Sequence, residues 1–518
     1  MGKNGEIAKT YRNYRPTGDE YQGTIGVAYG ERGDILDVQV RQSNNFFTRE
    51  GINILNLSER NIYVYLGYLN SIVAQYCLNL YTGQHKWPVY LDLLPVPSYL
   101  SKSEEIKSIA MKILANKRFW YSLDETNLEY HGLISHFDNK ESLKDNLEKM
   151  QEKLTVDYDR YEGLVTENDD LWMDLAEIAP DSDFRKTLNE YKDRRPYEEL
   201  LSIDGASTNN VVNNKVMAQE IVQELVGLVF GRWDIRYTKD KPVPDFGDVF
   251  DPLPFMPVVA LKDDEKDGYP LNIPQDGIIK GSDMVALIRK AMEYIWGEKA
   301  DDIEYELCQL IGTESLTEYL EDSNGFFAYH FMRYTKSRRK APIYWPLTSE
   351  DESETWWVYY PKLDERTLPN LVLKLTDEIT ILRADLQRTG DKDKASRLNN
   401  EMLDLQAMSD ELRRLQALPY KPNQDDGVPV TAAPLYTLFK NKKWRTTCEE
   451  NWKQLDKGDY DWSHLAYAIY RARIRQKAKK DWCMALTHGL EELCENKPKE
   501  KKKKTTKNKP AREQSLTF

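Results

Sequence analysis

The stretch LVLKLTDEITILRADLQRTG at residues 371–390 carries the clearest structural pattern in the chain. Its apolar residues recur every three or four positions, which is the spacing of one face of an α-helix. They are Leu375, Ile379, Leu382 and Leu386. The turn sequence Thr389-Gly-Asp-Lys-Asp follows, and then comes a second apolar stripe. That stripe comprises Leu398, Leu403, Leu405, Leu412 and Leu415. We therefore predict a helical hairpin of coiled-coil type over residues 366–420.

The composition changes several times on either side of this hairpin. Short alternating apolar runs before residue 100 predict strands, whereas apolar residues at helical spacing dominate from 101 to 241. The fold class that we predict is α+β and multidomain, predominantly helical. The predicted units are a small mixed α/β unit at 1–100, a helical spacer at 101–241, a mixed domain at 242–365, the hairpin at 366–420, a Trp-rich helical domain at 421–495 and a disordered Lys-rich tail at 496–518.

The overall charge sets limits on the function. The 518 residues carry a formal net charge of -13, which argues against a uniformly basic wrapper of nucleic acid but leaves room for a local basic groove. No stretch approaches 18 uncharged apolar residues, so we expect no membrane contact. The five cysteines include no CxxC pair, which is typical of a reducing compartment. We therefore predict a cytoplasmic protein.

The sequence contains no strong motif for catalysis, cofactor binding or metal binding. The glycines from Gly26 to Gly33 lack the spacing of a cofactor loop and precede no helix pattern, so we predict no catalytic and no cofactor-binding residue. Asp181, Glu190 and Lys192 imitate a metal-dependent nuclease site. Helical periodicity over 183–193 instead favours a helix that begins at Asp181 or Ser182. The six histidines include no i, i+4 pair, and we predict no metal site.

A basic segment after residue 332 has the composition of a DNA contact. Arg333-Tyr-Thr-Lys-Ser-Arg-Arg-Lys combines five cations with a tyrosine and two hydroxyl groups. Its candidate DNA-binding residues are Arg333, Lys336, Arg338, Arg339 and Lys340. The alternative is a basic loop that bridges acidic surfaces of the same chain. A second basic stretch, at 471–480, is typical of a solvated helix face.

Several strings, in this order, resemble the C-terminal half of the adenine-specific DNA methyltransferases of phage-exclusion (BREX-type) and restriction-modification systems. The matching strings are Tyr65-Leu-Gly-Tyr-Leu-Asn-Ser, Leu94-Pro-Val-Pro, Phe230-Gly-Arg-Trp-Asp-Ile-Arg, Tyr269-Pro-Leu with Asp276-Gly-Ile, Arg338-Arg-Lys-Ala-Pro-Ile-Tyr-Trp-Pro-Leu, Asp425-Asp-Gly-Val with Ala433-Pro-Leu, and Gly458-Asp-Tyr-Asp-Trp. The resemblance implies a target-recognition domain at 1–100 and adds Asn70 and Ser71 to the candidate DNA contacts. The acidic run after Leu347 departs from the family's more neutral turn.

The resemblance lacks the part of the family that performs chemistry, namely the methyl-donor loop and the tetrapeptide that grips a flipped adenine. It implies a specificity subunit or fragment that binds double-stranded DNA, while a separate catalytic subunit supplies S-adenosylmethionine and methyl transfer. Whether the chain is itself an enzyme stays open. The alternative function is a non-enzymatic scaffold in a phage-defence complex, which would contact other defence proteins through the hairpin at 366–420.

Overall fold

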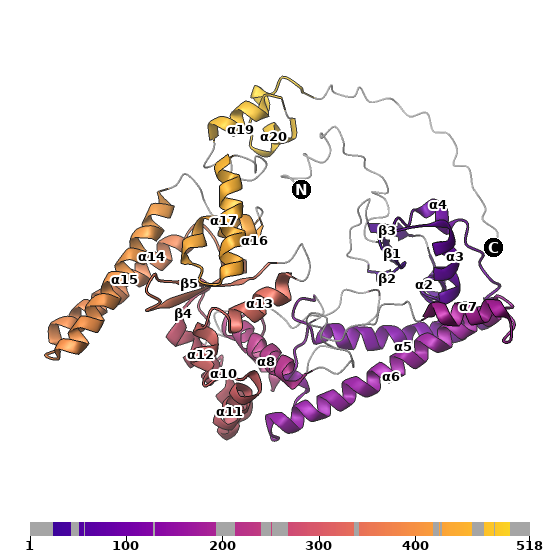
Figure 1. Cartoon of the computed structure of the whole chain (residues 1–518), viewed down its shortest axis with the longest axis horizontal. Coiled ribbons are helices and arrows are strands. Elements are labelled where there is room, and N and C mark those ends of the chain that lie inside the picture. The colour runs from indigo at the N-terminus through magenta and orange to yellow at the C-terminus, as the bar shows by residue number, and fades with distance from the viewer. Residues whose placement is uncertain are drawn as a thin grey trace.

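The structure is a computed structural model, shown in Figure 1. It describes residues 24–42, 51–55, 57–127, 130–192, 213–239, 250, 268–335, 341–417, 424, 427–457, 471–480 and 482–497. The fold is predominantly helical with two three-stranded antiparallel sheets, so the predicted α+β class is confirmed. The buried apolar side chains form two separate clusters, which agrees with the predicted multidomain organisation.

The first sheet belongs to an N-terminal unit. Its strands are β1 (Gly26–Gly30), β2 (Val38–Arg41) and β3 (Gly51–Ile54), and β1 is central. The sheet packs on α2 (Glu59–Leu69), which is followed by α3 (Ile72–Tyr81) and α4 (Pro88–Leu91). Val27 and Ile62 are completely buried in the apolar cluster that the sheet and α2 share.

Two long helices connect this unit to the rest of the chain. They are α5 (Ser103–Ser122), which follows the short helix η3 (Leu100–Lys102), and α6 (Leu143–Leu175). With 33 residues, α6 is about 50 Å long. Trp172, near the end of α6, lies in the N-terminal cluster, whereas Leu147, near its start, lies in the larger central cluster. The pair therefore acts as a spacer with an apolar anchor at each end (Figure 1).

A second connection runs through Phe250. This side chain packs edge-on against Tyr63 of α2, with 5.8 Å between ring centroids, and is 7% exposed. Thr238 and Leu271, on either side of Phe250 in sequence, belong to the central unit, because Leu271 lies in its cluster and Thr238 ends η5 (Ile235–Thr238). The spacer helices are therefore not the only link between the two cores.

The central unit is built around α8 (Asn214–Val229), whose residues from Glu220 onward are all buried. The second sheet has the order β4-β6-β5. The elements around α8 are β4 (Ile278–Lys280), α10 (Gly281–Trp296), η6 (Gly297–Lys299), α11 (Ala300–Ile311), α12 (Leu316–Glu321), α13 (Phe326–Thr335), β5 (Tyr344–Thr348), β6 (Thr355–Tyr359) and η7 (Tyr360–Lys362).

The predicted hairpin is confirmed as α14 (Thr367–Arg388) and α15 (Lys392–Gln416), which project from the central unit in Figure 1. Asp391 caps α15 by accepting the Asp393 and Lys394 N–H groups at 2.9 and 3.3 Å. Asp404, midway along α15, joins the hairpin to the central unit, because its carboxylate accepts Asp351 N–H and Ser353 N–H of the acidic β5–β6 turn at 3.0 and 3.3 Å.

The C-terminal elements that the structure describes are helical. They are α16 (Val428–Ala432), η9 (Ala433–Leu438), α17 (Lys442–Lys457), α19 (Arg471–Ala478), α20 (Trp482–Thr487) and η10 (Glu491–Leu493). Phe439 packs edge-on against Trp345 of β5, with 6.2 Å between ring centroids. None of the described helices is long and apolar enough to cross a membrane.

Candidate nucleic-acid interface

A buried ionic network lies where the spacer helices meet the central unit. Arg232, in the turn after α8, donates to Glu125 Oε1 at 2.6 Å and to the Tyr334 hydroxyl at 2.8 Å. Arg333 of α13 pairs with Asp124 Oδ1 at 2.7 Å and with Glu220 Oε1 at 2.6 Å. The Tyr329 hydroxyl also donates to Glu220. Because each guanidinium has a carboxylate partner, the two cations can remain charged in the interior.

The acids of this network hold protons more tightly than usual. Burial raises the pKa of Glu220 to about 7, although Arg333 opposes the shift. Burial raises the pKa of Glu224 to about 8, and its Oε2 accepts Leu133 N–H and Ile134 N–H at 2.8 and 3.1 Å. Gly132 permits this close approach, since it has φ of +85° and a Cβ there would lie 2.2 Å from Glu224 Oε1.

His330 joins α13 to β5. Its Nε2 accepts Ile343 N–H at 2.9 Å and Tyr344 N–H at 3.3 Å, and its Nδ1 lies 3.2 Å from Gln223 Oε1. The ring is therefore neutral with its proton on Nδ1, and burial lowers the pKa of His330 well below its usual value. Together with Arg333, this contact fixes the backbone on both sides of the loop between α13 and β5.

Three of the predicted DNA-contact residues make contacts within the protein instead. The Arg333 side chain is only 4% exposed and is ion-paired on two sides, so we remove it from the candidate DNA contacts. Asn70 instead exchanges hydrogen bonds with the backbone of Val38, and the buried Ser71 caps α3. Both side chains thus hold the N-terminal unit together. The remaining predicted contacts, Lys336, Arg338, Arg339 and Lys340, lie outside the described residues.

The nuclease-like triad lies at the predicted helix. Glu190 and Lys192 lie on α7 (Asp183–Lys192), which begins after Ser182, whose hydroxyl accepts Arg185 N–H at 3.1 Å. The predicted helix start is confirmed. Lys192 lies 3.6 Å from Asp170 of α6, so its ammonium has a structural partner. Within the described part of the chain, no three His, Cys, Asp or Glu side chains are placed to hold a metal ion.

Sequence analysis missed an exposed basic surface at the start of α17. Lys442, Lys443 and Arg445 are all exposed, and Asn441 caps the helix by accepting Trp444 N–H at 3.2 Å. We call these three cations the α17 basic turn. They lie at the positive end of the helix dipole, which disfavours cations and favours an anion. The signal was present in the sequence, since no acid occurs from residue 442 to 448.

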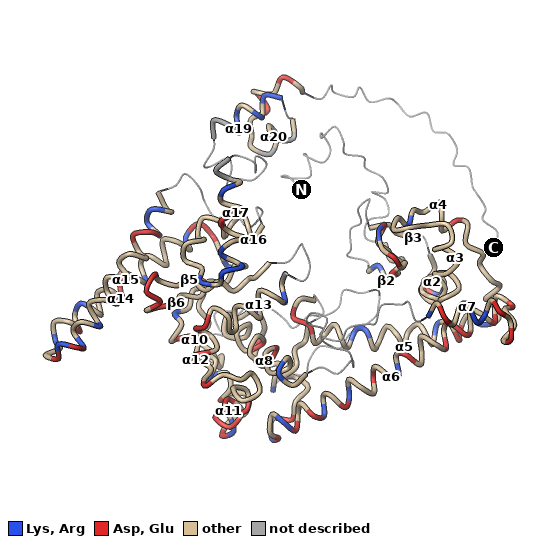
Figure 2. Tube along the Cα trace, in the orientation of Figure 1, with Lys and Arg blue, Asp and Glu red and all other residues tan. Residues whose placement is uncertain are grey.

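The α17 basic turn lies beside α13. The Trp444 ring contacts Phe331 of α13, with 5.6 Å between centroids, and Asn441 Nδ2 donates to Ser323 O at 2.8 Å. Figure 2 shows basic residues at the start of α17. The fold therefore brings a basic surface from residue 442 onward next to the helix that leads into the basic segment at 333–340.

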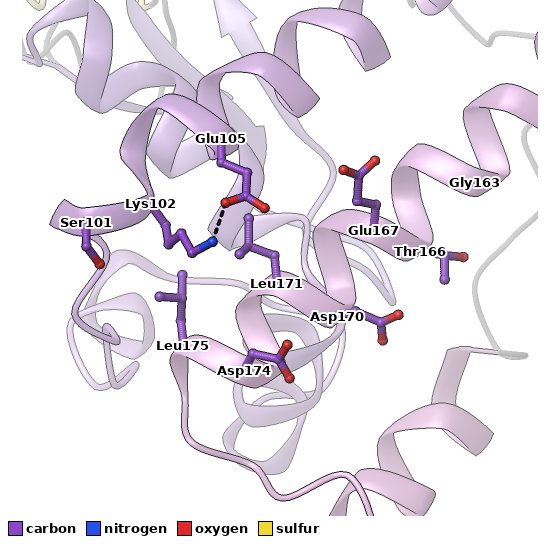
Figure 3. A pocket seen from close by; sticks show the side chains of 10 residues that line it. All are labelled: Ser101, Lys102, Glu105, Gly163, Thr166, Glu167, Asp170, Leu171, Asp174 and Leu175. Atoms are coloured by element: carbon purple, nitrogen blue, oxygen red, sulfur yellow. Dashed lines mark hydrogen bonds and ion pairs between the residues drawn. The ribbon is translucent and has the colours of Figure 1, made fainter.

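A cavity on the spacer helices is lined by acidic residues. It has a volume of about 650 Å³ and lies between the start of α5 and the end of α6. Figure 3 shows Glu105, Glu167, Asp170 and Asp174 around it, and Lys102 pairs with Glu105 at 2.6 Å. Like charges repel, so this part of the spacer is unsuited to contact phosphate.

No family model and no curated protein matches the chain.

Proposed function

We propose that this chain is a DNA-recognition subunit, or a fragment of one, in a split adenine-specific DNA methyltransferase system. It binds duplex DNA and positions it for a separate catalytic subunit that carries S-adenosylmethionine. The observation that carries the DNA-binding part is the α17 basic turn, together with its contact to α13 through Trp444 and Phe331. The methyltransferase context rests on the sequence resemblance.

The proposed binding surface joins two segments that are about a hundred residues apart in sequence. The α17 basic turn supplies cations for the phosphate backbone, which gives affinity without sequence preference. Arg338 and Arg339, which lie outside the described residues, remain candidates for bidentate contacts to guanine, which would give sequence preference. The acidic spacer then limits binding to the side of the molecule that carries α13 and α17.

A salt titration tests this surface. Fluorescence anisotropy would measure the affinity of a labelled duplex for the parent and for the Lys442→Ala/Lys443→Ala/Arg445→Ala variant at several salt concentrations. Each phosphate contact contributes about 0.9 to the slope of log affinity against log salt, so the triple variant should flatten the slope by up to about 2.7.

The hairpin tip provides a matched control. Lys392, Lys394 and Arg397 are also two lysines and an arginine, exposed at the start of another helix. Their triple alanine variant should keep the parent slope. If the α17 variant binds duplex DNA like the parent, or if the parent binds none, the proposed surface is wrong.

A scaffold remains the second candidate function, favoured by exposed apolar side chains on the projecting hairpin. Leu373, Ile381 and Leu403 are 61%, 54% and 56% exposed. Under this alternative, Leu373→Asp would abolish assembly with other defence proteins while leaving DNA affinity unchanged. Isothermal titration with S-adenosylmethionine separates both candidates from a self-sufficient methyltransferase, because stoichiometric binding to this chain alone would contradict both.

A further inference from the structure

Exposed apolar side chains are concentrated in one segment of the N-terminal unit. Every residue from 80 to 100 is described, and fourteen of these twenty-one residues are exposed. The stretch holds seven of the fifteen large apolar side chains that are exposed in the described part of the chain. They are Leu80, Tyr81, Trp87, Val89, Leu93, Val96 and Leu100. Asp92 is the only exposed Asp, Glu, Lys or Arg in the stretch. We call this stretch the 80–100 surface.

The 80–100 surface is held in place by contacts with the rest of the N-terminal unit. Leu94 is buried in the N-terminal cluster, and the Tyr68 hydroxyl of α2 donates to Pro95 O. Lys86 is 1% exposed, and its ammonium donates to Thr82 Oγ1 at 3.0 Å and to Gly83 O at 2.9 Å. The Trp87 indole donates to Glu31 at 2.7 Å. Since the surface is already ordered, a partner would bind it without a large loss of conformational entropy.

Its composition is that of a protein interface. Aromatic side chains are enriched and charged side chains depleted at the centre of such interfaces. Seven large side chains, each about half exposed, expose on the order of several hundred Å² of apolar area, which is as much as the largest patch on a typical monomer. A stable interface covers about 800 Å² and 20 to 30 residues on each partner. The seven apolar side chains would form the centre of an interface of that size, and the other exposed residues of the stretch would extend it.

We propose that the 80–100 surface binds a second copy of this chain about a twofold axis. A nearly uncharged apolar surface is complementary to itself, as an isologous interface requires. The net charge of -13 on each copy opposes association, and this repulsion weakens as salt is added. Self-association through this surface should therefore be maintained or strengthened by salt, unlike association through ion pairs. This proposal is independent of DNA binding.

Sedimentation velocity of the full chain over a range of concentrations tests the proposal. The parent should show a concentration-dependent monomer–dimer equilibrium that persists in high salt. The Leu93→Asp/Leu100→Asp variant, at positions 57% and 67% exposed, should weaken the dimer about tenfold or more. The Val156→Asp/Tyr305→Asp variant introduces the same charges at positions 65% and 66% exposed on α6 and α11, and it should dimerise like the parent.

A photo-crosslink locates the contact without depending on the stability of any variant. A photoreactive amino acid at Val96 should give a covalent dimer, whereas one at Val156, which is 65% exposed on α6, should not. A parent that stays monomeric at all concentrations would overturn the proposal and assign the surface to another protein. Equal loss of dimer in both double variants, or a crosslinked dimer from Val156 but not from Val96, would overturn it as well.

Discussion

Two basic regions lie next to each other in the central part of the molecule and differ in their partners. Arg232 and Arg333 are surrounded by Asp124, Glu125 and Glu220. Lys442 and Lys443, on the far side of the Phe331–Trp444 contact, have no carboxylate partner among the described residues. The first pair is balanced within the protein, whereas the second presents uncompensated charge to the solvent.

This difference shows why a run of cations in a sequence does not identify a nucleic-acid contact. A buried guanidinium with two acids around it stabilises the fold, and it could bind phosphate only by leaving those acids uncompensated. An exposed cation without an acid partner contributes little to the fold and is available to a polyanion. The decisive quantity is the number of carboxylates near each cation, which is a property of the tertiary structure.

The largest expected effect is the loss of Arg333. Replacing Arg333 by Met leaves Glu220 and Asp124 without their guanidinium, and breaking a buried pair in this way costs about 3–5 kcal/mol. Urea denaturation of the central unit, followed by tryptophan fluorescence, would measure it. The loss should be larger at pH 8 than at pH 6, because an unpaired Glu220 can take up a proton at lower pH. If Arg333→Met is as stable as Lys443→Met, the assignment of Arg333 to the fold is wrong.

The sequence predicts local elements well and long-range partners poorly. The hairpin expected at 366–420 is α14 and α15, and the helix expected to begin at Asp181 or Ser182 is α7 at Asp183–Lys192. The three-residue strand β4 was missed, because its only strand partner is β6, about eighty residues later. The burial of Arg333 was missed for the same reason, since Asp124 lies 209 residues away. Periodicity contains no information about such pairs.

Residues of the strings that resemble the methyltransferase family also make long-range contacts that the sequence does not predict. Phe230 and Tyr344 belong to different strings, yet their rings stack with 5.4 Å between centroids, and Arg232 also reaches the Tyr344 hydroxyl. Gly67 packs against Trp172 and Asn168 of α6. These described residues hold cores together. Packing therefore accounts for residue choice in these strings without any reference to DNA.

A smaller effect concerns the pH dependence of the buried network. The pKa of Glu224 is raised by burial to about 8, so above pH 4.5 the folded state keeps a proton that the unfolded state has lost. Its contribution to stability is therefore complete below about pH 4.5 and is lost as the pH rises through 8. His330 acts in the opposite direction, because its lowered pKa makes stability rise with pH, but only up to about 6.5, the value in the unfolded chain.

Between pH 6.5 and 8, therefore, the change in stability with pH comes mainly from the buried acids and not from His330. Glu224→Gln should flatten the decline in the free energy of unfolding over this window by about 1.5 kcal/mol, and the comparison is made by urea titrations of parent and variant at each pH. Glu148→Gln, at an exposed position on α6, should follow the parent. Equal declines in parent and Glu224→Gln would show that Glu224 titrates in the folded protein as it does in water.

The smallest effect on stability is expected for Lys443→Met. This variant is informative because its stability and its salt slope of DNA affinity should respond differently. Lys443 is exposed and has no carboxylate partner among the described residues, so the free energy of unfolding should change by less than about 0.5 kcal/mol. It could even rise slightly, because a cation leaves the positive end of a helix dipole. The salt slope of DNA affinity should nevertheless flatten by about 0.9, since one phosphate contact is lost. Lys394→Met on the hairpin should change neither quantity. A change in stability without a change in slope would mean that Lys443 belongs with Arg333, and the distinction between the two basic regions would then be lost.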